Sequence, residues 1–325
     1  MILSVSRRTD IPAFYSDWFY NRLKEGFFYS RNPMNSKQIS NISLSPELID
    51  CIVFWSKNPS PMLDRLKEVD KLYGAKYYFQ FTLNPYEKDL EAYLPPKKQI
   101  IETFKNLSNK IGPERVVWRY DPIILTDKYD VNYHRNAFKE LLKELAPYTK
   151  RCVVSFVDLY AKTTRNMREI NFIEFTDEKM RELAREISNQ AAIYNLPVES
   201  CAEIIDLSAQ GIQHTHCIDA NLIKDIVKAA TGCDMDLDNK KDKDKSQRQE
   251  CGCIASRDMG AYNTCLHGCK YCYANWDPDE VRKNFQQCDK NSPLLFGTVQ
   301  QNEKVTTIDK KLANSRIKEA NLFDR

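Results

Sequence analysis

The sequence lacks the segments that would take a chain into or across a membrane. No apolar run approaches the roughly 18 residues that a membrane-spanning helix needs. No charged-then-apolar leader precedes the opening residues MILSVSRRTD. We therefore expect a soluble, cytoplasmic protein with no membrane partner.

The sequence also lacks a strong excess of charge of either sign. It contains 48 Lys and Arg residues against 45 Asp and Glu, which gives a formal net charge of +3. This near balance argues against a polyanion bound over the whole surface, although it leaves room for a local basic patch. With 325 residues, 42% of them hydrophobic, the chain is long enough for one large α/β domain or two smaller ones.

Short apolar runs alternate with segments of helical periodicity along the N-terminal two thirds of the chain. Such alternation favours βαβ units and a parallel sheet. The expected strands are 2–6, 51–55, 77–81, 115–119, 152–156 and 196–200, and the expected helices are 61–73, 97–111, 133–146 and 177–194.

Polar or ionisable groups follow each of the six expected strands, among them Arg7, Lys57 and Asp121. A doubly wound open sheet would concentrate such groups at one switch point, whereas a barrel spreads them around its mouth. We therefore expect an α/β fold with a full or partial (β/α) TIM-like barrel over residues 1–232. The charged segment Asp234–Glu250 is expected to be a flexible solvated loop that joins the barrel to a cysteine-rich region at 233–325, which packs over the barrel mouth.

The chain has eleven cysteines, and eight of them lie between Cys201 and Cys272. Cys51 and Cys152 stand alone in apolar runs, so we interpret them as buried small hydrophobic residues. Because the chain is large and has no secretory leader, we interpret the clustered cysteines as thiolate ligands in a reducing cytosol rather than as disulfides.

Three of these cysteines, Cys265, Cys269 and Cys272, form the short motif CLHGCKYC. A structural zinc site usually takes two CxxC pairs, and a bacterial ferredoxin uses CxxCxxC with a fourth cysteine further on. Neither pattern is present in this motif. Three thiolates make an incomplete set for a closed site, so they indicate a metal centre with an open position, with zinc as the alternative.

The spacing CxxxCxxC, followed by YAN, resembles the signature of the radical S-adenosylmethionine enzymes. In that superfamily three cysteines hold a 4Fe–4S cluster whose fourth iron binds S-adenosylmethionine, and an electron then cleaves the sulfonium to a 5′-deoxyadenosyl radical. The resemblance implies this chemistry here, with an electron donor such as flavodoxin or ferredoxin and a barrel of the radical SAM type. It also implies that Tyr271 lies near the adenine. The protein would position the cofactor and exclude competing reactions.

The position of this motif departs from the superfamily, whose members usually carry it after the first strand. Here the motif follows the last strand, as though the chain were permuted. In this the chain resembles an uncharacterised bacterial family, whose members begin with a sequence like SRRTDIPA and end in a similar cysteine cluster. The segments that carry the resemblance are 6–13, 54–59, 118–122, 201–203, 217–219, 247–253 and 258–272. This resemblance does not indicate what the substrate is.

The stretches FWSKNP and VVWRYDPI show a distant resemblance to spore photoproduct lyase, a radical enzyme that repairs a thymine dimer in DNA. The resemblance implies that Ser56 and Lys57 contact S-adenosylmethionine, in place of the glycine-rich GGE segment that this chain lacks. Lys57 would meet the cofactor carboxylate as a point charge. Arg119 and Asp121 either line a polar substrate pocket, together with Arg7 and Arg8, or pair with each other structurally.

Four further cysteines, Cys201, Cys217, Cys251 and Cys253, suffice for a closed second site. A second 4Fe–4S cluster is expected there, with a four-thiolate zinc site and no metal at all as alternatives. Cys233 is a spare candidate ligand, and Cys288 is expected to be unliganded.

Three further residues complete the expected site. Glu203 and Asp10 would face the barrel mouth and could orient the substrate or exchange a proton, unless they pair with Arg7 or Arg8. His267, inside the cysteine motif, would tune the exposure of the cluster. The expected function is a radical S-adenosylmethionine enzyme that acts on an unknown small molecule or nucleic acid. The alternatives are a zinc-stabilised nucleic-acid-binding module and a DNA-lesion repair enzyme of the photoproduct-lyase type.

Overall fold

A computed structural model describes residues 1–158 and 161–308 of the chain. Its central feature is an eight-stranded sheet in the order β11-β10-β8-β6-β5-β4-β1-β12, in which every neighbouring pair is parallel. The six expected strands are all present. The strands are β1 (Ile2–Val5), β4 (Cys51–Ser56), β5 (Tyr77–Thr82), β6 (Val116–Ile123), β8 (Cys152–Phe156), β10 (Val198–Cys201), β11 (Gln213–Thr215) and β12 (Ser256–Asp258).

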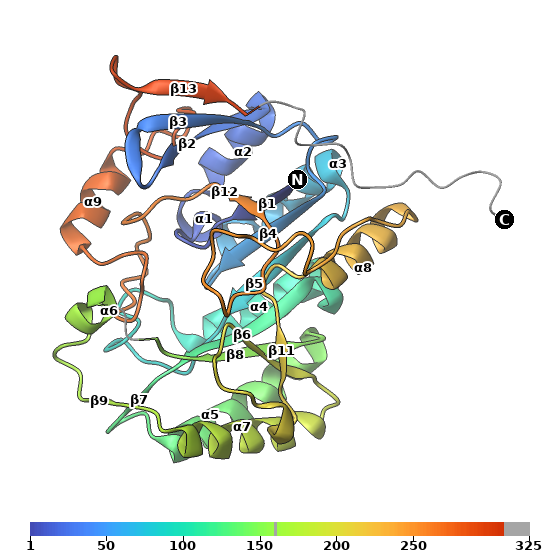
Figure 1. The fold of residues 1–325 in the computed structure, drawn as a ribbon, viewed down its shortest axis with the longest axis vertical. Helices are drawn as coiled ribbons and strands as arrows, with labels where there is room; N and C mark the ends of the chain where they lie inside the picture. The colour runs from blue at the N-terminus through green and yellow to red at the C-terminus, as the bar shows by residue number, and fades with distance from the viewer. Residues whose placement is uncertain (159–160, 309–325) are drawn as a thin grey trace.

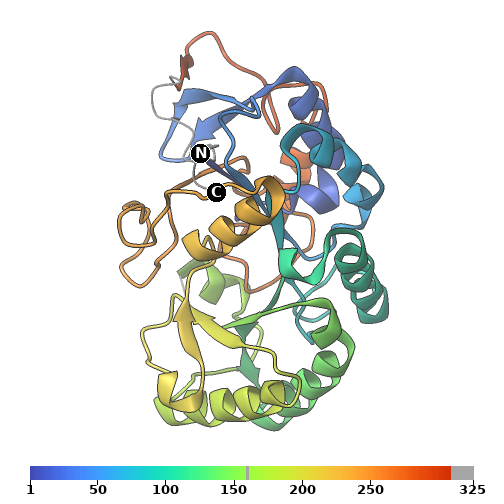
Figure 2. The same cartoon turned by 90° about the vertical axis from the view of Figure 1, so that its right-hand side faces the viewer.

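This arrangement confirms an α/β fold with a parallel sheet that is compatible with a partial barrel. Within the described residues, no strand pairing joins the edge strands β11 and β12, so the sheet is not closed by backbone pairing. Figures 1 and 2 show the strands at the centre of the molecule, with α5 (Val131–Leu145) and α7 (Asp177–Ala192) side by side at one end.

The helices follow the predicted pattern closely. The four predicted helices correspond to α3 with the 3-10 turn before it, α4, α5 and α7. Side-chain caps mark two of the starts, because Asp130 accepts a hydrogen bond from the backbone N–H of Tyr133 and Thr176 accepts one from Lys179. The helices are α1 (Ile11–Phe14), α2 (Ser16–Glu25), α3 (Leu66–Tyr73, after the turn Ser60–Arg65), α4 (Lys97–Ile111), α5 (Val131–Leu145), α6 (Ala161–Asn166), α7 (Asp177–Ala192), α8 (Ala220–Thr231) and α9 (Pro278–Gln286).

Strand β12 comes from the C-terminal region but pairs with the N-terminal strand β1. Ile2 lies opposite Ser256, and Ser4 lies opposite Asp258. When β12 is placed first, the spatial order β12-β1-β4-β5-β6-β8-β10-β11 follows the chain without exception. The two regions separated in the sequence prediction therefore share one sheet, although the domain division itself stays a prediction.

Two smaller sheets were not predicted from the sequence. β2 (Phe27–Asn32) and β3 (Asn35–Ser43) form an antiparallel hairpin, and β13 (Lys304–Thr307) pairs with β3. β7 (Leu125–Thr126) pairs with β9 (Phe172–Ile173). The hairpin lies at the opposite end of the molecule from α5 and α7 (Figure 1). Its strands are mostly polar, and only Phe28, Ile39 and Ile42 are buried, which explains the weak apolar signal.

The charged segment Asp234–Glu250 has no helix or strand, as expected for a loop, but it is anchored to the body of the protein. Met235 and Leu237 are buried in an apolar cluster with Ile254. The backbone N–H of Asp244 also donates to Cys253 O at 2.9 Å. These contacts hold the segment beside the cysteines that follow it.

His134 is a neutral core residue, and it makes the stability of the fold sensitive to acid. Its Nδ1 lies 2.7 Å from Tyr120 Oη and its Nε2 lies 2.9 Å from Ile124 O. Burial lowers its pKa from 6.5 to about 4. The neutral form therefore stabilises the fold above pH 6.5, and this contribution is lost as the pH falls from about 6.5 to 4.

We expect the free energy of unfolding to fall by about 2 kcal/mol more between pH 7 and pH 5 in the wild type than in His134→Gln, because the variant has no imidazole to protonate. Urea titrations at both pH values measure this difference. Equal acid sensitivity of the two proteins would contradict the prediction.

Candidate functional site

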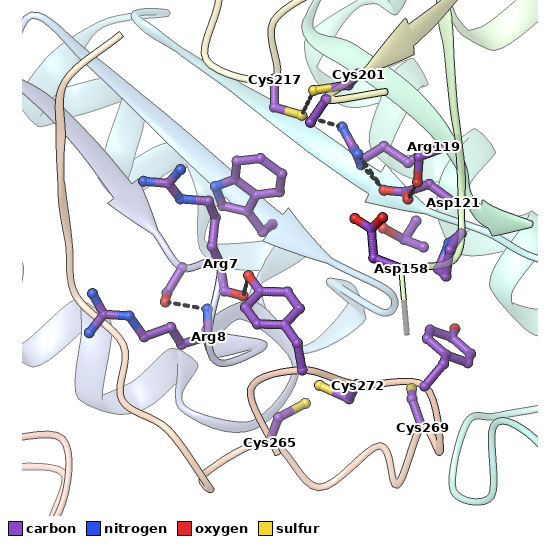
Figure 3. A pocket seen from close by; sticks show the side chains of 18 of the residues that line it. Arg7, Arg8, Arg119, Asp121, Asp158, Cys201, Cys217, Cys265, Cys269 and Cys272 are labelled. Atoms are coloured by element: carbon purple, nitrogen blue, oxygen red, sulfur yellow. Dashed lines mark hydrogen bonds and ion pairs between the residues drawn. The ribbon is translucent and has the colours of Figure 1, made fainter. Parts of the chain in front are cut away.

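The carboxyl ends of the parallel strands open into a cavity of about 510 Å³. The polar strand ends predicted from the sequence meet there, since residues at or just after the carboxyl ends of β1, β4, β6, β8 and β10 all line it. All seven predicted metal ligands also line this one cavity. Figure 3 labels Cys201, Cys217, Cys265, Cys269 and Cys272 among them. The lining includes Arg7, Arg8, Asp10, Ser56, Lys57, Arg119, Asp121, Cys201, Cys217, Cys251, Cys253, Cys265, His267, Cys269, Tyr271 and Cys272.

The two cysteine sets occupy different parts of the cavity wall. Figure 3 shows Cys201 and Cys217 beside Arg119 on one side, and Cys265, Cys269 and Cys272 on the opposite side.

The loop that carries Cys265, Cys269 and Cys272 is fixed by the segment after β5. Lys270 N donates to Leu90 O at 3.0 Å, Tyr93 N donates to His267 O at 3.0 Å, and Glu91 forms a β-bridge with Cys269. Gly268 has a φ of +66°, and a Cβ there would lie 2.7 Å from the ring of Tyr93. Glycine is therefore required both for the backbone conformation and for the close packing.

Asn275 completes the support of this loop. Its side-chain oxygen accepts hydrogen bonds from the backbone N–H groups of Thr264 at 2.7 Å and Cys265 at 2.8 Å. Its side-chain nitrogen donates to Arg8 O at 3.1 Å and to Cys272 Sγ at 3.4 Å. Asn275 thus joins the two ends of the motif to the segment after β1, a role that the sequence pattern alone did not reveal.

Cys265 and Cys269 have thiols that favour the neutral form. Burial raises the pKa of Cys265 well above its ordinary value and that of Cys269 to about 12. A metal that binds here would therefore displace protons from the thiols. As they stand, no three or more His, Cys, Asp or Glu side chains in residues 1–158 and 161–308 are arranged so that they could hold a metal ion. Side-chain rotation would be needed for either cysteine set to coordinate one.

Glu91 is a buried carboxylate that links the loop to β4. Lys57 Nζ donates to its Oε1 at 2.8 Å and Tyr271 Oη donates to the same oxygen at 2.5 Å, while Lys97 donates to Oε2. Burial alone would raise the pKa of Glu91, but the charges of Lys57 and Lys97 lower it to about 2. The structure thus brings Lys57 and Tyr271 together through a residue that the sequence pattern did not single out.

Asp10 is a second buried carboxylate at the cavity wall. It accepts hydrogen bonds at 2.7 Å each from Ser56 Oγ, the backbone N–H of Lys57 and His267 Nε2. Its partner is therefore His267 and not Arg7 or Arg8. Ser56, Lys57 and Tyr271 all line the cavity, and their contact with S-adenosylmethionine stays a prediction.

Cys201, Cys217, Cys251 and Cys253 are all buried free cysteines. The Sγ atoms of Cys201 and Cys217 lie 2.8 Å apart, and Cys253 interacts with the side chains of the other three. Arg119 Nη1 donates to Cys217 Sγ at 2.9 Å. Hydrogen bonds from Cys201 and Cys253, together with the charge of Arg119, lower the pKa of Cys217 well below its ordinary value.

Arg119 and Asp121 pair with each other, which was one of the two expectations. Arg119 Nε donates to Asp121 Oδ2 at 2.8 Å, and Ser155 donates to the other carboxylate oxygen. Both residues line the cavity, whereas Glu203 is not among its lining residues. Glu203 accepts a hydrogen bond from Phe156 N at 2.8 Å, and burial raises its pKa to about 7.

The remaining cysteines lie outside the cavity. Cys51 and Cys152 are fully buried within strands, as expected from their apolar neighbours. Cys233 donates a weak hydrogen bond to Thr231 O at 3.6 Å, and neither it nor Cys288 is among the cavity-lining residues.

Within the described residues, no helix is both long and apolar enough to cross a membrane. A comparison with curated proteins found no match. Among solved structures, the carboxyl transferase domain of Rhizobium etli pyruvate carboxylase is similar at a TM-score of 0.33 and 12% identity, over 94% of this chain and 49% of that chain. A putative alpha-L-fucosidase from Bacteroides thetaiotaomicron gives a TM-score of 0.24 and 11% identity, over 75% of this chain and 86% of that chain.

Both structural similarities are too weak to support an argument about function, and the resemblance to spore photoproduct lyase stays a prediction. The family comparison covers much more of the sequence. The family model described as a domain of unknown function, DUF1848, matches residues 2–274, from β1 through the whole cysteine motif. The chain therefore belongs to the DUF1848 family, as the resemblance to an uncharacterised family predicted.

Proposed function

We propose that the protein is a radical S-adenosylmethionine enzyme whose 4Fe–4S cluster is held by Cys265, Cys269 and Cys272. The observation that carries the proposal is that three thiols on one short, well-anchored loop line the cavity at the carboxyl ends of a parallel sheet. Three thiolates are the donor set of a cluster that keeps one iron open. Catalytic sites of such sheets lie at this end of the strands.

The place of β12 supports the same function. The cysteine loop follows β12, and β12 lies outside β1 at the edge of the sheet. In spatial order the loop therefore follows the first strand, which is where the superfamily that it resembles carries its cluster loop. The late position of the motif in the sequence is then a change of chain order and not of site architecture.

When bound, the cluster and S-adenosylmethionine would together supply a 5′-deoxyadenosyl radical for hydrogen abstraction. The residues of the chain have positioning roles. Lys57 presents a buried ammonium beside Tyr271 at the cavity wall, where a cofactor carboxylate could replace part of its contact with Glu91. Asp10 orients Ser56 and the backbone of Lys57, and His267 anchors the cysteine loop to Asp10.

The substrate would lie between the two cysteine sets. In this region Arg7, Arg8, Trp55 and Ser155 line the cavity. None of the ion pairs among the described residues includes Arg7 or Arg8. The charge of Asp258 acts on Arg7 from beyond ion-pair distance. Two guanidinium groups outside the ion pairs favour a substrate that carries an anionic group.

The test is anaerobic reconstitution of the full chain with iron and sulfide, followed by reduction with dithionite in the presence of S-adenosylmethionine. We expect a brown protein with about four irons and four sulfides at this loop, and formation of 5′-deoxyadenosine. Zinc in the loop without iron would overturn the proposal and favour the zinc-stabilised binding module. A reconstituted cluster that never cleaves S-adenosylmethionine would also overturn it.

A further inference from the structure

We propose that Cys201, Cys217, Cys251 and Cys253 bind one zinc ion through four thiolates, at a site separate from the cysteine loop 265–272. This inference does not depend on the proposed function, because it rests on different residues. It concerns the four-cysteine set for which the sequence suggested a second iron–sulfur cluster.

Three separate segments of the chain bring these cysteines together. Cys201 ends β10, Cys217 follows β11, and Cys251 and Cys253 precede β12. All four are buried, with exposed fractions of 4%, 8%, 7% and 2% in chain order, and all are free thiols. Cys253 interacts with the side chains of each of the other three. Once their side chains rotate toward a common point, four neighbouring buried thiols make the donor set of a closed structural zinc site.

The closeness of the sulfur atoms favours a single ion over a cluster. Tetrahedral zinc with bonds of about 2.3 Å places its ligand sulfurs about 3.8 Å apart. A 4Fe–4S cube binds each cysteine at a separate corner and keeps the sulfurs roughly 6 Å apart. Cys201 Sγ and Cys217 Sγ lie 2.8 Å apart. They would need to separate by about 1 Å for zinc but by about 3 Å for a cube, and close packing of the surrounding core opposes the larger movement.

The backbone between Cys251 and Cys253 also packs closely against the residue before Cys217. Gly252 lies between them, and a Cβ at this position would be 2.0 Å from His216 Nδ1. The turn therefore packs directly on the imidazole ring next to Cys217. Any larger residue at Gly252 would clash with the His216 ring, so the ring or the turn would have to shift.

Donors outside the four thiols would offset the negative charge of a zinc–tetrathiolate centre. Arg119 Nη1 donates to Cys217 Sγ at 2.9 Å, and the backbone N–H of Ile218 donates to Cys253 Sγ at 3.4 Å. Arg119 is itself held by Asp121 and by Gln80 Oε1 at 3.3 Å. Arg119 is thus a positioning residue for the sulfur group, as is usual for the outer partners of metal ligands.

The site has a structural role that follows from its place in the sheet. Cys201 and Cys217 belong to the edge formed by β10 and β11, whereas Cys251 and Cys253 lead into the opposite edge strand, β12. Ile254 N donates to Ile218 O at 3.1 Å, so the two segments already touch. A bound zinc would join the two edges of the open sheet and close the circle that strand pairing leaves open.

The first measurement is the zinc, iron and acid-labile sulfide content of the full-length protein, together with that of Cys217→Ser and Cys253→Ser. We expect about one zinc per chain in the wild type and a loss of at least 80% of it in both variants. Cys269→Ala and Cys288→Ala are the matched controls, and both should keep their zinc. Iron and sulfide that remain in Cys269→Ala, in place of zinc, would overturn the proposal.

A second measurement covers the case in which the serine variants do not fold. Metal-free wild-type protein is titrated with Co²⁺, which should produce the intense thiolate-to-cobalt and tetrahedral d–d absorption of a four-sulfur site at about one Co²⁺ per chain. Chelation of zinc from the wild type should also lower the Tm by roughly 10 °C. Absence of both effects would refute the zinc site. Neither readout involves S-adenosylmethionine. Failure of the proposed enzyme activity would therefore not contradict the zinc site.

Discussion

Cys269→Ala should reduce the formation of 5′-deoxyadenosine more than about 100-fold relative to the wild type, since loss of a direct ligand exceeds the cost of losing an outer partner. Cys269 lies at the centre of the loop, where it bridges to Glu91 and lines the cavity. Without its thiolate, two ligands remain for the proposed cluster. Iron and sulfide after anaerobic reconstitution should therefore fall by about four each per chain.

The control for this variant is Cys288→Ala, which removes a thiol outside the cavity. It should keep the iron content and the rate of S-adenosylmethionine cleavage of the wild type. Near-normal activity of Cys269→Ala would show that the loop does not carry the cluster. Equal loss in both variants would point to a general effect of thiol removal.

The second large expected effect is that of a Glu91 substitution on the stability of the fold. Glu91→Gln should lower the free energy of unfolding by about 3 kcal/mol, because it leaves the ammonium groups of Lys57 and Lys97 without their shared anion. The Glu91 side chain is 1% exposed and that of Lys57 is 14% exposed, so water can replace little of the lost interaction at Lys57. Urea unfolding followed by circular dichroism at pH 7 measures the change.

Two further variants sharpen this test. Glu87→Gln removes an exposed carboxylate that pairs with Lys128, and it should change stability by less than about 0.5 kcal/mol. The double variant Glu91→Gln/Lys57→Met should recover part of the loss, since it removes one of the two unpaired cations. Additive effects of the two substitutions would contradict direct coupling between Glu91 and Lys57.

The parts of the fold that could be predicted from the sequence are those whose pattern lies within one short segment. The helix predicted at 97–111 has those bounds in the structure, because its apolar positions recur every three to four residues and Gly112 follows its last turn. The run CIVFW predicted β4 because a strand buried on both faces is continuously apolar. The predicted strand ends placed Lys57, Arg119 and Cys201 around one cavity, and the structure adds the other six cysteines to it.

Other features depend on partners far away in the chain and could not be found in this way. β12 is the polar tripeptide Ser-Arg-Asp, and it is a strand because β1 offers it a free edge more than 250 residues away. Glu91 gives no local signal, since its role arises from two lysines and a tyrosine brought in by other elements. Asn275 closely follows the cysteine motif in the sequence, but its function depends on the backbone of Arg8.

The pairing of β12 with β1 has a consequence for biosynthesis. The ribosome synthesises β1, Asp10 and Glu91 long before it reaches the cysteines of the loop 265–272. Domains generally begin to fold from the N-terminus while translation continues. The thiols of the loop therefore emerge onto a scaffold whose anchoring partners already exist. Loading of the proposed iron–sulfur centre must then be among the last events of maturation, and a nascent chain stalled before residue 256 should contain no iron in this loop.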